Sequence, residues 1–388
     1  MQYRKFGKKI DWAPSALGFG MMRLPTIDGT QDSAAIQYSK AKRMVRYAIH
    51  HGLNYIDTAW PYHGGQSERF LGRILREGCG EKVRIATKMP SWEIKEPADL
   101  DEFFNKQLAR LQTNHIDFYL LHCLNEERWK NYRTLGVSEW IEKVKDEGKI
   151  DHIGFSFHDD LDTFKEIVDS YSWDFCQIQY NYIDQDFQAG RAGLQYASKR
   201  GLGVVIMEPL RGGQLATELP EKVLKVLEDT GIKRNPVEWA LLWLWDQPEV
   251  SVVLSGMSTL NQVKENLKIA HNSGIGQLTQ EEKETLERAR EVYEGMLPVK
   301  CTGCNYCVTQ GFSSCPQGIR IPYLLDLYNK AHLYKDYEER KAKYYDLEKE
   351  SRASACINCG HCEERCPQKL PITDLMEEIK EYFEDEQI

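Results

Sequence analysis

The sequence of 388 residues lacks both a long apolar run and an apolar start. Its longest apolar stretch, WALLWLW at 239–245, is far shorter than the about 20 apolar residues that cross a bilayer as a helix. The first residues, MQYRKFGKKI, are charged and hold no apolar core of a secretory signal peptide. We therefore expect a cytoplasmic protein that does not associate with a membrane.

An excess of positive charge is also absent, since the formal net charge is −9 at pH 7. A negative chain does not favour a nucleic-acid-binding surface, so we expect no nucleic acid partner. Hydrophobic residues make up 41% and charged residues 28% of the chain, as in ordinary globular proteins. The length is too great for one small domain and fits a large domain followed by a smaller one.

Cysteine is scarce before residue 300, where only Cys79, Cys123 and Cys176 occur among the 11 cysteines of the chain. We expect these three to be ordinary thiols of the larger domain. Because no secretory signal is present, the cysteines that follow indicate a reducing compartment and metal binding rather than disulfides.

The G-x-G-x-x-G signature of a Rossmann fold is missing after the first predicted strand. Eight short apolar runs instead alternate with segments of helical periodicity: ALGFG, NYIDTA, VRIATK, IDFYLLH, HIGFSF, FCQIQY, GVVIM and SVVLSG. Such runs suit parallel strands that are buried on both faces. The alternation predicts an α/β fold, a (β/α)8 TIM barrel over about residues 15–295, with a doubly wound sheet as the competing architecture. The segment before the first run is predicted to form a hairpin at the barrel bottom.

The composition changes after residue 297, where strand signals stop and cysteine density rises. We predict two domains, a barrel over 1–297 and a small, α-rich iron-sulfur domain over 298–388. The last stretch, DLMEEIKEYFEDEQI, is strongly acidic. It is interpreted as a solvated helix face, with an electrostatic docking patch as the alternative.

Polar residues follow or end three neighbouring predicted strands. Asp57 and Tyr62 follow the second strand, Lys88 ends the third, and His122 ends the fourth. Each residue alone has an ordinary structural explanation, such as a helix cap or a surface group. In such barrels, however, the C-terminal strand ends form the active face, so the four side chains are expected to converge there.

These four residue types together permit one particular reaction. A phenol titrates near pH ~10, which makes it a poor proton donor at neutral pH, but a neighbouring ammonium lowers its pKa. Lys88 would do so for Tyr62, with Asp57 holding Lys88 charged and oriented. His122 would donate a hydrogen bond to the same substrate oxygen. The set predicts reduction of a carbonyl group by a hydride donor.

The sequence also resembles the aldo-keto reductase family over about residues 1–290. The resemblance is carried, in family order, by NYIDTAWPYHGGQSERFLGRIL, ATK, IDFYLLH, HIGFSFHD, QIQYN, EPLRGGQLA and SVVLSGMSTLNQVKENL. It implies an oxidoreductase that uses NADP or NAD on a (β/α)8 barrel, with Tyr62 as proton donor. The implied substrate is a small carbonyl compound or alcohol.

The same resemblance implies the residues that contact the nicotinamide cofactor. They are Ser156, His158, Gln177, Met207, Leu210, Gly212, Gly256, Ser258, Gln262, Glu265 and Asn266. His158 is expected to replace the usual Asn, because Phe157 stands in that place, and Met207 takes the place of the aromatic residue that stacks on nicotinamide. Many family members have Arg where this chain has Gln262, and a guanidinium pairs well with a 2′-phosphate. NAD and NADP therefore both stay open.

Two cysteine clusters, CTGCNYC and CINCGHC, resemble those of bacterial two-cluster ferredoxins, and each is followed by a Cys-Pro pair. In that pattern the fourth cysteine of each run binds the other cluster. The resemblance assigns Cys301, Cys304, Cys307 and Cys366 to one [4Fe-4S] cluster, and Cys356, Cys359, Cys362 and Cys315 to a second. The first run is longer than usual before its last cysteine. Structural zinc is the alternative, although it prefers pairs of cysteines.

The purpose of the clusters is not fixed by the sequence. Three roles are considered for the clusters: stabilising the fold of a small domain, sensing redox state, or carrying electrons to a redox partner protein. Two further hypotheses for the whole chain are an electron-transfer protein between nicotinamide and a ferredoxin-type acceptor, and a redox-sensing protein that only binds nicotinamide.

Overall fold

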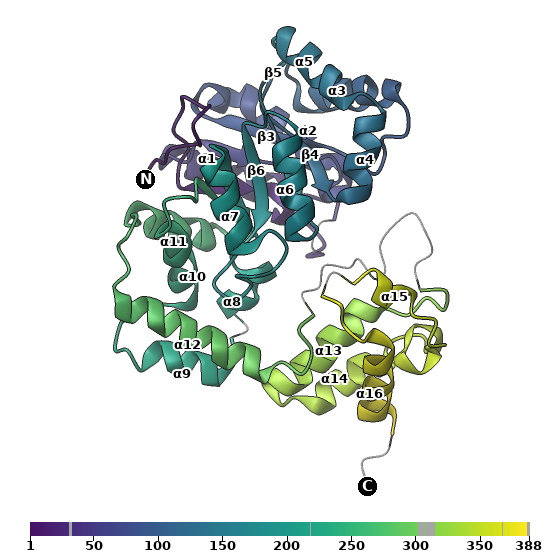
Figure 1. Ribbon diagram of the computed structural model, residues 1–388. Coiled ribbons are helices and arrows are strands. Elements are labelled where there is room, and N and C mark those ends of the chain that lie inside the picture. Colours follow the sequence, from purple (N-terminus) through teal and green to yellow (C-terminus); the bar gives the residue numbers. More distant parts are fainter. Residues whose placement is uncertain (31–32, 218, 302–306, 308–314, 367, 386–388) are drawn as a thin grey trace. The chain divides into compact units, whose positions relative to one another are not determined.

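The computed structural model describes residues 1–388 except 31–32, 218, 302–306, 308–314, 367 and 386–388 (Figure 1). The chain forms two compact units. The barrel unit comprises Met1–Glu218 and Lys233–Lys283, and the helical unit comprises Leu219–Ile232 and Glu284–Ile388. The domain boundary expected between residues 297 and 298 stays a prediction, because compactness alone does not show where a domain folds independently.

Eight parallel strands of the barrel unit close into a barrel in sequence order. They are β1 (Leu17–Gly20), β2 (Tyr55–Asp57), β3 (Arg84–Met89), β4 (Ile116–Leu124), β5 (Ile150–Phe157), β6 (Phe175–Gln179), β7 (Gly203–Met207) and β8 (Val252–Gly256). Leu17 of β1 pairs with Val253 of β8 and closes the ring. The predicted TIM barrel is confirmed, and the doubly wound sheet is excluded.

Helices follow the strands and cover the outside of the barrel (Figure 1). They are α1 (Tyr38–His50), α2 (Gln66–Ile74), α3 (Pro97–Leu111), α4 (Glu126–Thr134), α5 (Val137–Asp146), α6 (Leu161–Ser170), α7 (Gly190–Lys199), α8 (Gln214–Thr217), α10 (Pro236–Trp245) and α11 (Leu260–His271). Local sequence sets their ends. Asn235, for example, accepts a hydrogen bond from the amide of Glu238 and caps α10, whose first residue is Pro236.

An aromatic cluster fills the bottom of the barrel. The segment before β1 forms antiparallel bridges between Tyr3 and Ser15 and between Phe6 and Ile10, as predicted for a hairpin. The Phe6 ring lies 5.2 Å from the ring of Phe118, measured between centroids. A Cβ atom on Gly203 would come within 2.1 Å of the Phe6 ring, so only glycine fits there. This aromatic cluster around Phe6, the Phe6 plug, closes the bottom of the barrel, so the C-terminal strand ends form its open end.

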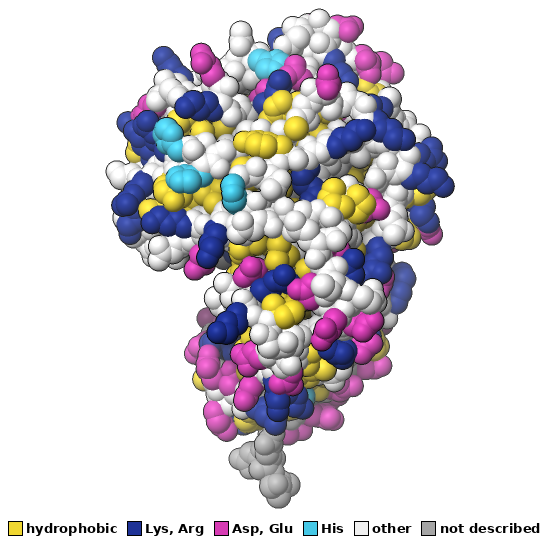
Figure 2. All heavy atoms as spheres, turned by 90° about the vertical axis from the view of Figure 1, so that its left-hand side faces the viewer, with side chains coloured by type: hydrophobic (Ala, Val, Ile, Leu, Met, Phe, Trp, Pro, Cys, Tyr) yellow, Lys and Arg dark blue, Asp and Glu magenta, His cyan; other side chains and the backbone are white. Residues whose placement is uncertain are grey.

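The helical unit has its own apolar core, built by Ile321, Leu324, Tyr344, Ile379 and Phe383 among others. Its helices are α9 (Glu221–Glu228), most of α12 (Gln280–Met296), α13 (Ile321–Tyr334), α14 (Tyr337–Tyr345), α15 (His361–Glu364) and α16 (Ile372–Glu384). Asp and Glu side chains are frequent on the face of this unit that Figure 2 draws.

Residues 374–384 of the acidic stretch lie in α16, whose apolar residues face the core of the helical unit. Glu377, Glu378 and Glu381 lie exposed on the opposite side of the helix. This arrangement matches the solvated helix face that the sequence predicts. None of the described helices is both long and apolar enough to cross a bilayer.

Candidate functional site

Three neighbouring strands bring the four predicted catalytic residues to the open end of the barrel. Asp57 is the last residue of β2, Lys88 lies near the end of β3, and His122 lies near the end of β4. Tyr62 begins a short 3-10 helix, η2 (Tyr62–Gly65), shortly after β2. Because β2 pairs in parallel with β3 and β3 with β4, the C-terminal ends of these strands, which carry or precede the four residues, lie at the same end of the barrel.

Lys88 is held at the centre of this group by a buried ion pair. Its Nζ donates to Oδ1 of Asp57 at 2.6 Å and to the carbonyl oxygen of Thr58 at 2.8 Å. The side chains of Lys88 and Asp57 are 0% and 3% exposed. Burial raises the pKa of the Asp57 carboxyl, while the ammonium of Lys88 acts in the opposite direction. The carboxylate therefore fixes both the charge and the direction of the lysine.

Tyr62 and His122 lie around the ammonium of Lys88. The Nζ atom of Lys88 lies 5.1 Å from the centre of the Tyr62 ring. The rings of Tyr62 and His122 are 6.2 Å apart between centroids and nearly perpendicular, at 81°. The structure thus brings all four predicted side chains together, through contacts that each involve Lys88 or Tyr62.

His122 is a neutral imidazole at neutral pH. Its side chain is buried, and burial lowers its pKa well below the ordinary value, with the charge of Lys88 lowering it further. Within the described part of the chain, its Nδ1 atom has no hydrogen-bond partner. A neutral imidazole can donate one hydrogen bond to the oxygen of a bound molecule without adding charge.

A buried network behind β3 was missed by sequence reasoning. Gln107 donates to the carbonyl oxygen of Lys88 at 3.0 Å and to Oε1 of Glu68 at 2.7 Å. Thr87 donates to the same oxygen of Glu68, and Arg110 donates to the other at 3.1 Å. Burial raises the pKa of Glu68, whereas these donors lower it. The network anchors the backbone that carries Lys88 to α2 and α3.

A sequence signal for this network existed. The buried face of α3 carries Leu100, Phe104, Gln107 and Leu111, so one polar residue stands at an apolar position of the helical repeat. A buried amide needs polar partners. Gln107 could therefore have been singled out from its place in the pattern, although its partners could not.

The residues predicted to contact nicotinamide lie at the ends of the next three strands. Ser156 is in β5, Gln177 in β6 and Met207 at the end of β7. Gln177 donates to the sulfur of Met207 at 3.6 Å, and its Oε1 has no partner among the described residues. Ser156 accepts a hydrogen bond from the amide of Cys123 at 2.7 Å. Burial lowers the pKa of His158 to about 4, so this imidazole is also neutral at neutral pH.

The residues predicted to contact the adenosine end surround the start of α11. Gly256 ends β8, and the loop through Ser258 leads to Thr259, which caps the helix. Oε1 of Gln262 accepts from the amides of Ser258 and Thr259, at 2.8 and 3.1 Å, as part of a capping box. Asn266 donates to the hydroxyl of Ser255 at 2.9 Å and is buried. Gln262 and Asn266 therefore stabilise the loop itself, and Glu265 is exposed.

Leu210 and Gly212, predicted near the pyrophosphate, lie in a turn after β7. Leu210 precedes a short 3-10 helix, η5 (Arg211–Gly213), and Gly212 has a left-handed φ of 69°. A Cβ atom on Gly212 would lie 3.5 Å from a guanidinium nitrogen of Arg23. The turn therefore lies close to Arg23, which follows β1, the second strand along the ring from β7.

Three cysteines after residue 350 and one from the earlier run come close in the helical unit. Burial raises the pKa of the Cys356 thiol, and the nearby thiols of Cys315 and Cys359 raise it further. Burial likewise raises the pKa of Cys362 to about 11, with added contributions from Cys356 and Cys359. These four are the thiols that the ferredoxin pattern assigns to one cluster, and four thiols fit a [4Fe-4S] cluster.

The backbone between these cysteines is suited to wrapping around a cluster. Asn358 and Gly360 both adopt left-handed conformations, with φ of 53° and 75°. Both residues therefore change the direction of the chain between Cys356 and Cys362. Of the other predicted ligands, Cys301 and Cys307 pack against the helical core and Cys366 is part of it, whereas Cys304 lies outside the described residues.

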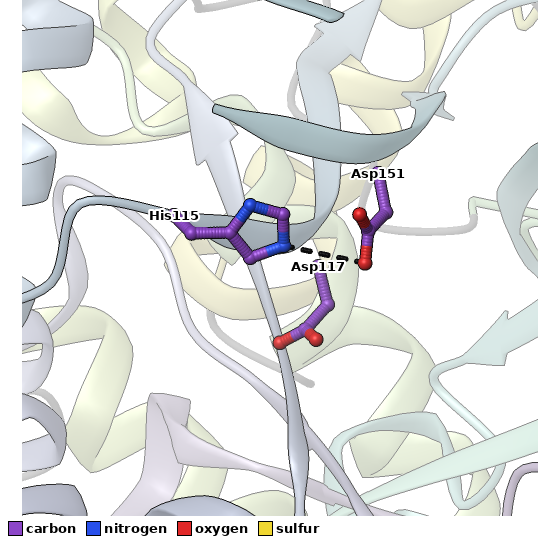
Figure 3. Close-up of side chains that lie close together, drawn as sticks. All are labelled: His115, Asp117 and Asp151. Carbon is purple, nitrogen blue, oxygen red and sulfur yellow. Dashed lines mark ion pairs between the residues drawn. The ribbon is translucent and has the colours of Figure 1, made fainter. Parts of the chain in front are cut away.

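A second polar cluster lies at the opposite end of the barrel strands. His115, Asp117 and Asp151 have ligand atoms within 4.8 Å of one another, and Nε2 of His115 pairs with Asp151 at 3.2 Å (Figure 3). Arg84 donates to both carboxylates, at 3.1 and 3.0 Å. Its guanidinium supplies the positive charge between them, so this cluster is an ion-pair network at the start of β3, β4 and β5.

Comparisons with known proteins match both parts of the chain. The family model described as "Aldo/keto reductase family" matches residues 16–291, and the one described as "4Fe-4S dicluster domain" matches residues 300–370. L-galactose dehydrogenase from Arabidopsis thaliana is 28% identical over 314 residues, which cover 74% of this chain and 92% of that protein. NADH-specific methylglyoxal reductase from Escherichia coli (strain K12) is 26% identical over 291 residues, covering 61% and 85%.

A solved structure with a similar fold is the holo form of the aldo-keto reductase AKR11C1 from Bacillus halodurans. It matches with a TM-score of 0.63 and 28% identity, covering 74% of this chain and 96% of that one. The matched share is close to the length of the barrel unit.

The ion pair of Lys88 gives a first prediction about stability. Asp57→Asn leaves a buried ammonium without its counter-charge, so we expect a loss of about 3–5 kcal/mol in the free energy of unfolding. Asp101→Asn is the matched control, because Asp101 pairs with Lys143 at 2.9 Å but both side chains are about half exposed; it should cost about 1 kcal/mol or less. Urea unfolding followed by tryptophan fluorescence measures both, and equal losses would contradict the buried pairing.

Proposed function

The chain belongs to the aldo/keto reductase family, and on this premise we propose that it interconverts a small carbonyl compound and its alcohol with a nicotinamide cofactor. The observation that carries the proposal is the ammonium of Lys88, buried against Asp57 and 5.1 Å from the centre of the Tyr62 ring. Such a charge favours the phenolate form of a tyrosine and so makes its hydroxyl a better acid.

The proposed reaction divides the work between cofactor and protein. When bound at the ends of β5, β6 and β7, the reduced nicotinamide would be the source of the hydride that the carbonyl carbon accepts. As the carbonyl electron pair moves to oxygen, Tyr62 transfers its hydroxyl proton to that oxygen. Lys88 stabilises the resulting phenolate, and the neutral imidazole of His122 donates a hydrogen bond that orients the carbonyl. The reverse sequence oxidises an alcohol, with Tyr62 as base.

The strand ends of β5, β6 and β7 are proposed to hold the nicotinamide. Gln177 supports this, because its Oε1 is buried without a partner in the described chain and is an acceptor for a carboxamide NH2. Met207, which contacts the same glutamine, offers a thioether to the ring face. Ser156 accepts a hydrogen bond from the amide of Cys123 and contacts the thiol of that residue, and these contacts position its hydroxyl at the end of β5.

Tyr62→Phe tests the proposed acid. We expect carbonyl reduction to fall about a hundredfold or more, because general acid catalysis contributes about 10²–10⁴-fold, while nicotinamide binding stays unchanged. Tyr171→Phe is the control, since Tyr171 donates to Glu142 in an exposed position away from the barrel mouth. Turnover is measured on a panel of small aldehydes and ketones, and dinucleotide binding by fluorescence titration. Undiminished turnover in Tyr62→Phe would refute the mechanism.

For the helical unit we propose two [4Fe-4S] clusters, one held by Cys301, Cys304, Cys307 and Cys366 and one by Cys315, Cys356, Cys359 and Cys362. The proximity of Cys315 to Cys356 supports the crossed assignment of the second set. Because five of these cysteines pack against the apolar core from its edge, we propose that the clusters stabilise this unit.

Cys315→Ala tests whether Cys315 is a cluster ligand. We expect iron to fall from about eight to about four atoms per chain, because one cluster loses a ligand while the other keeps all four. Cys79→Ala is the matched control, a buried thiol of the barrel unit that should leave the iron content unchanged. Iron and acid-labile sulfide are assayed in protein purified without oxygen. Full iron content in Cys315→Ala would exclude this residue as a ligand.

One observation favours a second role for the clusters, the exchange of electrons with a redox partner protein. Cys359 is exposed, and next to the Cys356 thiol the side chain of Ile357 is 58% exposed. A cluster near the surface is accessible to a partner, and an exposed apolar side chain beside it suits transient docking.

Electron exchange predicts that the clusters communicate with the nicotinamide pool. Anaerobic mixing with NADH or NADPH should produce the electron paramagnetic resonance signal of reduced clusters, since one reduced nucleotide yields a proton and two electrons, one electron for each of the two clusters. The same mixture with oxidised nucleotide is the control. Clusters that stay silent with both reduced nucleotides, yet respond to dithionite, would leave the stabilising role alone.

A further inference from the structure

An irregular stretch of β4 binds a cation directly after the proposed catalytic histidine. The pairing of β4 with β5 shifts register between Leu121 and Leu124, and Cys123 within this interval has a left-handed φ of 54°. Such an irregularity bends a strand and changes the direction of its side chains. The carbonyl oxygen of Cys123 accepts a hydrogen bond from Nη1 of Arg128 at 2.7 Å. The guanidinium of Arg128 is therefore held next to the backbone that carries His122.

An indole ring lies between Arg128 and His122. The ring of Trp92 is 5.2 Å from the ring of His122, measured between centroids, and the guanidinium carbon of Arg128 is 5.7 Å from the centre of the same indole. The ring of His122 in turn is 6.2 Å from that of Tyr62. The proposed proton donor, the imidazole, an aromatic ring and a cation are thus successive neighbours in the barrel unit.

The charge of Arg128 acts on the same residues as the charge of Lys88. Burial lowers the pKa of His122, and both cations lower it further. Burial raises the pKa of the Cys123 thiol, whereas both cations lower it. Lys88 has no exposed surface and pairs with Asp57, so its ammonium cannot contact an anion of the substrate. Arg128 is only half-buried, so part of its side chain is accessible.

A buried amide lies in the same region. Gln188, in the loop between β6 and α7, is 9% exposed and has a left-handed φ of 55°. Among the described residues, neither Nε2 nor Oε1 of Gln188 has a partner of hydrogen-bond geometry. Burial lowers the pKa of His158 to about 4, the amide of Gln188 acts in the opposite direction, and the charge of Arg128 lowers it further. Gln188 and Arg128 therefore both lie near His158, and a buried amide normally has a partner.

We propose that Arg128, assisted by the amide of Gln188, binds a carboxylate group of the substrate, so that oxo acids and hydroxy acids are the preferred substrates. The proposal rests on the function proposed above and names its substrate class. A guanidinium has five N–H donors in a planar fork that matches a carboxylate, so the bond to Cys123 orients this group without exhausting it. In the reduction, the carbonyl carbon accepts the hydride and the carbonyl oxygen takes the proton of Tyr62. The carboxylate stays unreacted and becomes part of the hydroxy acid.

Matched acids and esters test this inference. Pyruvate, 4-oxobutanoate and 5-oxopentanoate, which differ in the distance between carbonyl and carboxylate, are compared with their methyl esters. The full-length protein is saturated with NADH or NADPH, and kcat and KM are measured for each substrate. We expect at least one acid to exceed its ester about tenfold or more in kcat/KM, because hydrogen bonds to a charged group contribute this much to binding. Arg128→Met should remove that preference, mainly by raising KM for the acid, and Arg128→Lys should retain part of it.

Arg133→Met is the matched control, because Arg133 lies on the same helix and pairs with Glu166 at 3.4 Å in an exposed position. It should keep the acid preference of the wild type. Gln188→Met is a second variant that leaves the cation in place and should also lower the ratio of acid to ester turnover. Circular dichroism shows which variants are folded, and if Arg128→Met is not, the ratios in Arg128→Lys and Gln188→Met decide.

Two results would overturn this inference and leave the proposed function standing. They are a wild type that reduces none of the acids better than its ester, and a folded Arg128→Met variant that loses acid and ester turnover equally. Absence of turnover with the acids, the esters and the panel of neutral aldehydes and ketones alike would overturn the proposed function, and this inference with it.

Discussion

The buried contact between Lys88 and Asp57 is the interaction on which the rest of the site depends. An ammonium with no exposed surface is stable only if its charge is balanced, and one carboxylate oxygen and one backbone carbonyl do this here. The contact joins β2 to β3, and it also fixes where positive charge stands relative to Tyr62 and His122. The same charge adds to the burial that keeps the imidazole of His122 neutral. In the proposed mechanism it also favours the phenolate form of Tyr62.

The surrounding layers serve the same arrangement. Gln107 donates to the carbonyl oxygen of Lys88, and Glu68 accepts hydrogen bonds from Gln107 and Thr87, so the backbone that carries the lysine is fixed to the elements behind it. At the other end of the barrel, the Phe6 plug closes the interior with aromatic rings. Aromatic and aliphatic side chains fill the interior at this end, whereas the buried pair of Lys88 and Asp57 lies near the other ends of the strands.

Much of this could be read from the sequence. The eight apolar runs predict the strands because each is buried on both sides, and Asp57, Lys88 and His122 were found because strand ends of a closed barrel must meet. The direction of Gln262 was not foreseen, although Thr259 and Gln262 form the T-x-x-Q pattern of a capping box. The family resemblance indicated a cofactor contact for Gln262, whereas its capping box directs the side chain to its own helix end. The partners of Gln107 could not be predicted, because Glu68 and Thr87 come from other elements of the chain and only the fold brings them to this helix.

The closure of the ring has a consequence for how the chain is made. β1 is synthesised first among the strands and β8 last, yet Leu17 to Gly20 pair with Val253 to Gly256 along one continuous ladder. Until residue 256 has left the ribosome, β1 therefore has a free edge that can pair with any exposed strand. A nascent chain in a crowded cell needs its early edge shielded for that interval. Pairing of β8 with β1 therefore removes the free edge at which the nascent chain could aggregate with other chains.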